Sequence, residues 1–194
     1  MPHESRTTLT DATAMRVLAH PTRLHLLGLL RERGPQTAAH LGDAVDEAPG
    51  TISYHLGKLA SIGLIEQTDQ GTDRRERWWR ATTDLTAWEP ADQIDDPTQL
   101  QASTALQRAI GQAYLTNFMA YLDAVPTMPR EWVAAAASSD RSLHLTVEQL
   151  AELRADLESV VSRFVDASTV NQAAATPGAE LVTLVYQAYR RPEA

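Results

Sequence analysis

Apolar residues in the first sixty positions recur at three- and four-residue spacing, which is typical of amphipathic helices. Met15 and Leu18 indicate a first helix, for which Thr10 or Asp11 is a suitable N-cap. Pro21 ends this pattern, because proline disfavours helix in the residue before it and suits the first turn of the next helix. That second helix is rich in leucine on most sides, so we expect it at the centre of a small bundle.

Two shorter helices are predicted next. Thr37 is expected to cap the first of them. The second covers about residues 51–62, and its apolar residues Ile52, Leu56 and Leu59 are four and three positions apart. This spacing predicts one buried stripe along the helix, with a polar face opposite.

A β-hairpin is predicted to follow the helices. Gly63 is expected to end the preceding helix in a left-handed conformation. Residues 64–67 and 77–81 then indicate two strands joined by a polar turn. One of the neighbours Trp78 and Trp79 should face the core and the other outward, because side chains alternate along a strand.

A long amphipathic helix is predicted in the middle of the chain. Residues 85–99 indicate a linker, since prolines and acidic side chains occur there without an apolar period. Residues 100–125 then carry apolar side chains at helical spacing. That stripe consists of Leu106, Ile110, Tyr114, Phe118, Tyr121 and Val125.

The C-terminal residues predict a small βαβ unit. A capping box at residues 146–149 begins a helix that is expected to run to about Val165. Residues 143–145 and 181–189 indicate strands on either side of it, and the Ala/Ser/Thr-rich residues 167–179 indicate a mobile loop.

The predicted fold class is therefore α+β and mostly α. Three helices followed by a hairpin form a winged helix-turn-helix pattern, which we assign to residues 1–84. Residues 85–99 are the expected linker, and residues 100–194 the expected region of a long helix and a small helix/strand unit.

The charge of the chain is unevenly distributed. The formal net charge of -8 argues mildly against a nucleic-acid partner. Residues 1–80, however, hold ten Lys/Arg and ten Asp/Glu, whereas residues 81–194 hold seven Arg and fifteen Asp/Glu. All of the net acidity thus belongs to the second part, and the winged-helix part is neutral.

Composition excludes several classes of protein. The chain has no cysteine, which excludes disulfides, thiolate catalysis and cysteine-ligated metal sites. No segment approaches the ~20 consecutive apolar residues of a membrane span, and the first ten residues lack the apolar stretch of a secretory signal. We expect a cytoplasmic protein without a membrane partner.

The polar face of the helix at residues 51–62 has the chemistry of a DNA-reading helix. Thr51, Tyr54 and Lys58 lie at three- and four-residue spacing opposite the apolar stripe, and Gly50 and Ser53 flank them. A major groove about 12 Å wide admits one such helix. Hydroxyl groups suit base edges, and the lysine suits a phosphate.

Arginines in the hairpin extend this surface. Arg74 and Arg75 lie at the turn, where a wing would follow the DNA backbone or enter the minor groove. The predicted partner is double-stranded DNA. The predicted DNA-binding residues are Thr37, Gly50, Thr51, Ser53, Tyr54, Lys58, Arg74, Arg75 and Arg77.

Three motifs resemble those of ArsR-like winged-helix transcriptional regulators. Residues 18–24, LAHPTRL, resemble the family's L-A-H-P-x-R-L opening, and residues 51–59, TISYHLGKL, resemble its recognition helix T-x-S-x-H-L-x-x-L. Residues 63–65, GLI, resemble the G-L-V/I that follows. The resemblance covers about residues 11–81, and the remainder is more loosely similar to an extension found in one subgroup.

The resemblance implies a homodimer that reads a palindromic operator. Family dimers commonly pair through the first helix and the helix after the wing, which correspond here to residues 11–19 and 100–125. Residues 100–194 are therefore the expected dimerisation and possible effector-binding region. The apolar stripe of residues 100–125 is equally well explained by packing on the core of its own chain.

The sequence departs from the metal-sensing members of that family. Residues 100–125 contain no histidine and, as an acid, only Asp123, and the six histidines of the chain show no ligand spacing. We therefore expect neither a metal site nor a cofactor. No catalytic motif is recognisable, and Asp95 and Asp96 are neighbours in the linker, so no enzyme is expected.

Two questions about function stay open at this point. An outward tryptophan could form an apolar pocket for a small organic effector with Tyr114, Phe118 and Tyr121, or it could pack at a domain interface. A protein-interaction adaptor that uses the winged helix as a scaffold is the alternative to a transcriptional regulator.

Overall fold

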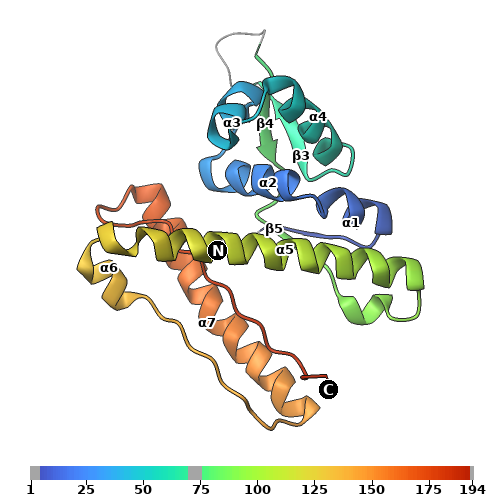
Figure 1. Ribbon diagram of the computed structural model, residues 1–194, viewed down its shortest axis with the longest axis vertical. Helices are drawn as coiled ribbons and strands as arrows, with labels where there is room; N and C mark the ends of the chain where they lie inside the picture. Colours follow the sequence, from blue (N-terminus) through green and yellow to red (C-terminus); the bar gives the residue numbers. More distant parts are fainter. Residues whose placement is uncertain (1–4, 70–75, 193–194) are drawn as a thin grey trace. The chain divides into compact units, whose positions relative to one another are not determined.

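The structure, a computed structural model, describes residues 5–69 and 76–192. The chain divides into two compact units, Met1–Thr127 and Met128–Ala194. Helices dominate both units, and the short strands lie in the first (Figure 1). This confirms the predicted α+β, mostly α class.

In the described part of the first unit there are five α-helices, and local signals in the sequence determine where they begin. The Asp11 carboxylate accepts a hydrogen bond from the backbone N–H of Ala14 at 2.8 Å. The Thr37 hydroxyl caps the third helix in the same way, which confirms its predicted role. The helices are α1 (Ala12–Leu18), α2 (Pro21–Arg33), α3 (Ala38–Val45), α4 (Pro49–Ala60) and α5 (Pro97–Ala124).

The wing is a three-stranded sheet in the order β2-β4-β3. The predicted hairpin is confirmed as β3 (Ile65–Thr68) and β4 (Trp78–Ala81), which pair antiparallel. The third strand, β2 (Gln36–Thr37), pairs with the other edge of β4 and is too short to leave a pattern in the sequence. Gly63 has a φ of 74°, the left-handed conformation predicted for the end of the recognition helix.

A second, parallel sheet joins β1 (Arg6–Thr8) to β5 (Leu85–Ala87). The Asp84 carboxylate accepts hydrogen bonds from the backbone N–H and the hydroxyl of Ser5, at 2.9 and 2.7 Å. These bonds hold the pKa of Asp84 below its ordinary value. From α2, Arg31 donates to the Thr83 carbonyl oxygen at 3.0 Å.

The range 85–99, expected to be a linker, contains regular secondary structure. That range contains β5 and a 3-10 helix, η1 (Pro90–Gln93). The strand is stabilised by pairing with a segment almost eighty residues away, which no local pattern reveals. The compact units also divide after Thr127 rather than at residues 85–99, because α5 packs against α1 and α2.

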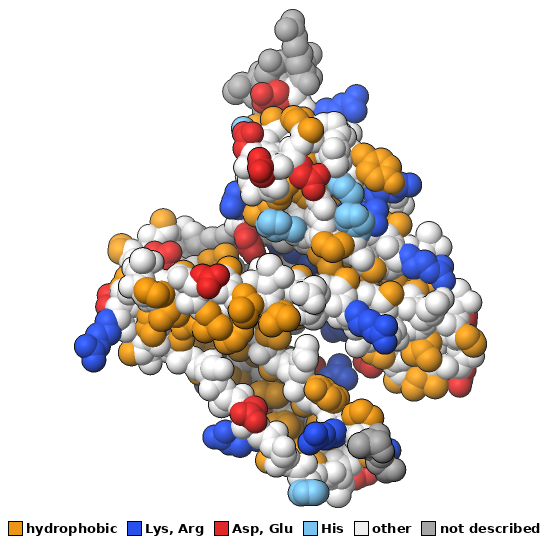
Figure 2. All heavy atoms as spheres, viewed as in Figure 1, with side chains coloured by type: hydrophobic (Ala, Val, Ile, Leu, Met, Phe, Trp, Pro, Cys, Tyr) orange, Lys and Arg blue, Asp and Glu red, His pale blue; other side chains and the backbone are white. Residues whose placement is uncertain are grey.

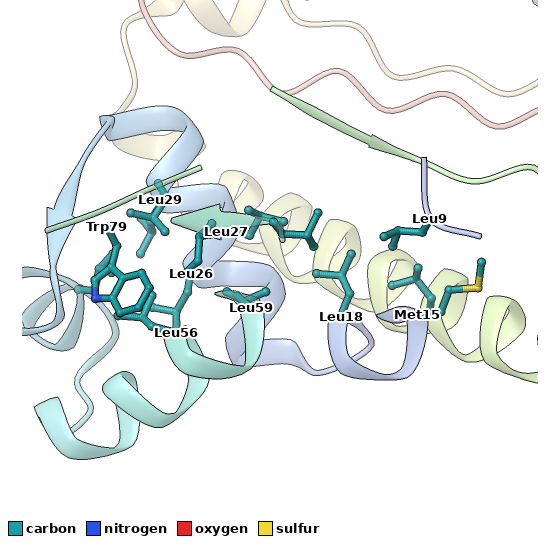
Figure 3. Close-up of a cluster of buried hydrophobic side chains, with 14 of the residues drawn as sticks. Leu9, Met15, Leu18, Leu26, Leu27, Leu29, Leu56, Leu59 and Trp79 are labelled. Atoms are coloured by element: carbon teal, nitrogen blue, oxygen red, sulfur yellow. The ribbon is translucent and has the colours of Figure 1, made fainter. Parts of the chain in front are cut away.

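One continuous core joins the winged helix to the beginning of α5. Figure 3 shows the buried side chains between Trp79 and Leu56 at one end and Leu9 and Met15 at the other. Ala102 and Leu106 of α5 belong to the same core, at 1% and 0% exposure. Trp79 is buried, as expected for one of the two neighbours, whereas Trp78 is half-buried and its ring lies 5.5 Å from that of His40 of α3.

The second unit contains α6 (Arg130–Ala135) and α7 (Val147–Ala174), and η2 (Val125–Thr127) precedes it. The capping box at the beginning of α7 is confirmed: Thr146 accepts from the Gln149 backbone, and the Gln149 side chain accepts from the Thr146 backbone.

The predicted βαβ unit is not formed. Residues 143–145 and 181–189 adopt no strand, because β propensity needs a pairing partner and neither segment has one. Most of the expected loop at residues 167–179 is helical, since α7 continues to Ala174. Alanine, the best helix former, outweighs the polar Ser/Thr composition there.

No helix in the described part of the chain is both long and apolar enough to cross a membrane.

Leu106→Ala should lower the free energy of unfolding of the first unit by about 2–5 kcal/mol, because it leaves a cavity where α5 meets the core. Leu100→Ala, on the same helix but at a position 38% exposed, is the matched control and should have a much smaller effect. Chemical denaturation followed by tryptophan fluorescence measures both variants. Equally small effects would show that α5 is not part of this core.

Candidate DNA-binding surface

Helix α4 has one fully buried face and one exposed polar face. Ile52, Leu56 and Leu59 are each 0% exposed and pack toward α2, α3 and β3. On the opposite face Tyr54 is 59% exposed and Ser53 is exposed. The structure thus confirms the predicted stripe, and Thr51, Lys58 and Gly50 are exposed as well.

The exposed side chains of α4 contact one another. The Lys58 ammonium lies 5.6 Å from the centre of the Tyr54 ring, within range of a cation–π contact. The Tyr54 ring also meets the buried His55 ring edge-on, at 5.4 Å between centroids. Tyr54 therefore projects from a supported position, with a positive charge beside it.

A hollow of about 350 Å³ lies between α3, α4 and the wing. It brings together three of the predicted residues, namely Thr37 at the beginning of α3, Ser53 of α4 and Arg77 before β4. Trp79 contributes to its lining. Thr37 is 6% exposed and its hydroxyl caps α3, so its side chain supports this surface from within.

Of the arginines expected in the wing, the structure describes Arg77 and Arg80. Arg77 is exposed. Arg74 and Arg75 lie outside the described residues, and their part in DNA binding stays a prediction from the sequence. Arg80 forms an ion pair with Glu66 on the neighbouring strand at 2.6 Å, and both side chains are half exposed.

Sequence reasoning missed a cluster of basic side chains between α2 and α4. The rings of His20 and His55 lie 4.8 Å apart, and Arg23 interacts electrostatically with His20. Burial, reinforced by Arg23 and His55, lowers the pKa of His20, and Glu47 opposes that shift. These residues come from separate motifs, so their proximity has no signal in the linear pattern.

The described residues contain no group of three or more His, Cys, Asp or Glu side chains arranged to hold a metal ion. Besides the Glu76 carboxylate at the edge of the hollow, the surface presents hydroxyl, amide, ammonium, guanidinium and imidazole groups. These are the groups with which proteins contact phosphates and base edges.

Helix α3, the turn after it and helix α4 form a helix-turn-helix, and the sheet of β2, β3 and β4 lies beside it. This arrangement defines a winged helix-turn-helix domain (Figure 1). Residues 18–68 match a family described as a helix-turn-helix domain. An uncharacterised HTH-type transcriptional regulator of Methanocaldococcus jannaschii is 33% identical over 61 residues, which cover 31% of this chain and 68% of that protein.

Similar solved structures include a possible transcriptional regulator for arsenical resistance, 28% identical over 55% of this chain and 93% of that chain, with a TM-score of 0.32. Another is Lactococcus lactis ZitR in complex with DNA, 16% identical over 74% of each chain, with a TM-score of 0.29. This chain belongs to the helix-turn-helix transcriptional regulators, and its motifs at residues 18–24, 51–59 and 63–65 resemble those of the ArsR-like members. Its family favours a regulator over an adaptor.

The stability of the domain should fall as the pH drops below 6.5, the ordinary value for histidine. Because the folded state lowers the pKa of His20, the unfolded chain binds more protons between 6.5 and that lowered value. Stability is therefore full above this interval and is lost as the pH falls through it. Denaturation at several pH values measures the effect.

His20→Asn should reduce this pH dependence. His25→Asn, which changes an exposed histidine of the same helix, should leave it intact. Parallel pH profiles for the wild type and the His20 variant would contradict the assignment.

Proposed function

We propose that this regulator acts as a homodimer that reads a palindromic operator, with α4 of each copy in the major groove of one half-site. The observation that carries the proposal is the exposed polar face of α4 opposite a stripe at 0% exposure. Burial of the stripe fixes the rotation of the helix about its axis, and so determines which side chains face DNA. Half-sites read by such a dimer lie about one helical turn apart.

The side chains divide into two roles in this proposal. Ser53 and Tyr54 offer hydroxyl groups to base edges, which carry the sequence information. Lys58 and Arg77 contact phosphates and position the domain. Gly50 and Thr51 lie in the first turn of α4, where free backbone N–H groups favour an anion. Arg74 and Arg75 complete the phosphate contacts at the wing.

The second half of α5 is the proposed dimer interface. The stripe predicted for residues 100–125 divides in the structure: Leu106 and Ile110 pack on the core, whereas Tyr114 and Phe118 are 41% and 44% exposed. Neighbouring apolar positions on α5 are exposed too. The exposed set is Tyr114, Leu115, Phe118, Met119 and Leu122.

A second copy of this chain is the proposed occupant of that face. The exposed residues recur at four- and three-residue spacing, so they form one continuous strip of the kind that pairs helices. A palindromic operator requires two recognition helices. Symmetric pairing of two chains through α5 brings together two copies of α4, one for each half-site.

An organic molecule is the proposed class of effector, and no metal ion is part of the proposal. The chain has no cysteine, and its described residues hold no group of side chains arranged to bind a metal ion, which favours an organic molecule over a metal ion. A pocket lined by an outward tryptophan, one of the two alternatives that the sequence left open, is not supported, since Trp78 packs on His40 and Trp79 lies in the core.

Tyr54→Ala and Ser53→Ala should each change which operator the protein prefers, at about 1–3 kcal/mol per lost base contact. Selection from random duplexes with purified protein, followed by binding titrations, measures the change. Arg74→Ala combined with Arg75→Ala should instead weaken binding to all sequences and reduce the salt slope by about two phosphate contacts. An unchanged preference in both α4 variants would contradict the proposed docking.

Phe118→Asp should convert the dimer to a monomer, because it places a charge in the apolar strip of α5. Sedimentation equilibrium measures the state of assembly. Operator affinity should fall sharply as well, since the two half-sites are no longer bound together. Gln112→Asp adds the same charge at an exposed polar position of α5 and should remain dimeric. Dimeric Phe118→Asp protein would contradict this interface.

A further inference from the structure

Arg23 of α2 is a positive charge without a counter-charge. Its side chain is half-buried, and its Nε atom is buried without a hydrogen-bond partner. Within residues 5–69 and 76–192, no carboxylate forms an ion pair with it. Burial lowers the pKa of Arg23, as expected for a guanidinium held partly away from water.

Arg23 interacts electrostatically with Tyr54 of α4 and with His20 at the N-cap of α2. The titratable group that acts on it electrostatically is the Tyr54 phenol, and Tyr54 in turn lies beneath the Lys58 ammonium at 5.6 Å. Arg23 also acts on His20, whose ring lies 4.8 Å from that of His55. Figure 2 shows histidine and Lys/Arg side chains gathered on this face over α2 and α4.

The beginning of α2 adds a second cationic feature. Pro21 occupies the first turn, and His20 at the N-cap makes no side-chain hydrogen bond to the helix. The backbone N–H groups of this turn are thus uncapped by a side chain, and a thirteen-residue helix places partial positive charge there. His55, 7% exposed, has an unpartnered Nδ1 in the same cluster.

An anion would supply what these groups lack, namely a counter-charge for Arg23 and hydrogen-bond acceptors for the first turn of α2. A partly desolvated guanidinium without a partner costs free energy in the free protein, and an oxyanion that binds it with two hydrogen bonds offsets that cost. Among the described residues, the Glu47 carboxylate acts on His20, and no carboxylate is among the groups that shift the pKa of Arg23.

We propose that Arg23 and the first turn of α2 form a binding site for a phosphodiester group of the DNA backbone, adjacent to the bases that Tyr54 reads. This rests on the proposed docking of α4 in the major groove. Arg23 then anchors the strand beside the recognition helix, and DNA supplies the counter-charge that the folded chain lacks.

Arg23→Met tests the site, because methionine retains the apolar stem and removes the guanidinium. The slope of log affinity against log salt should decrease by about 0.9, one phosphate contact, on both operator and unrelated duplexes. Preference among operators should be unchanged. Arg163→Met removes the same charge from an exposed position of α7 and should leave the slope unaltered.

Thermal unfolding separates a binding role from a structural one. The Arg23→Met variant should be as stable as the wild type or more stable, because it loses an unpaired, partly buried charge. A lower melting temperature together with lost binding would overturn the proposal in favour of a structural role. Arg23→Lys should retain the slope and lose affinity, since a lysine lacks the bidentate fork.

Inorganic phosphate distinguishes DNA from a free anion as the source of the phosphate. Phosphate that stabilises the wild type but not Arg23→Met, combined with an unchanged DNA salt slope, would show that the site serves a free anion and would overturn the proposal. Tyr54→Ala distinguishes failure of the Arg23 phosphate site from failure of the proposed docking of α4. If it changes operator preference while Arg23→Met leaves the slope intact, only the α2 site is refuted; if neither responds, the docking of α4 is refuted.

Discussion

The DNA-binding surface depends on the burial of one stripe on α4. Ile52, Leu56 and Leu59 are fully enclosed, and each such side chain contributes about 1.5–3 kcal/mol relative to exposure. Successive residues of a helix point about 100° apart. A rotation by one residue would therefore expose this stripe and bury Ser53 or Tyr54. The hydrophobic core thus orients the polar face without contacting any ligand.

Electrostatics then determine how this surface can hold a polyanion. The winged-helix part is neutral in total, so its affinity for DNA cannot come from a large uniform positive field. It comes from where the charges lie. Lys58 lies beside the exposed Tyr54, and Arg80 is already paired with Glu66. Arg23 remains unpaired, and the fold keeps it partly away from water.

The sequence allowed prediction of those features that are encoded locally. The caps at Asp11, Thr37 and Thr146 each need only a few neighbouring residues, and all three form. The reading face of α4 follows from helical spacing in the same way. The sheet of β1 and β5 depends on residues far apart in the chain, and β-like residues 181–189 remain unpaired, so neither outcome could be read from a local pattern. The basic cluster was missed for the same reason, because His20 and His55 meet only in the folded domain.

The pairing of β1 with β5 joins the two ends of the winged helix. Ser5 and Asp84 are separated by 79 positions along the chain and are hydrogen-bonded to each other, so the intervening residues form a closed loop. Neither end can fray without releasing the other, and the Arg31 contact to Thr83 is released with them. A partner that peeled away the N-terminal strand would loosen the segment leading into α5 at the same time. The first and last strands of the domain, β1 and β5, should therefore unfold together as one cooperative unit.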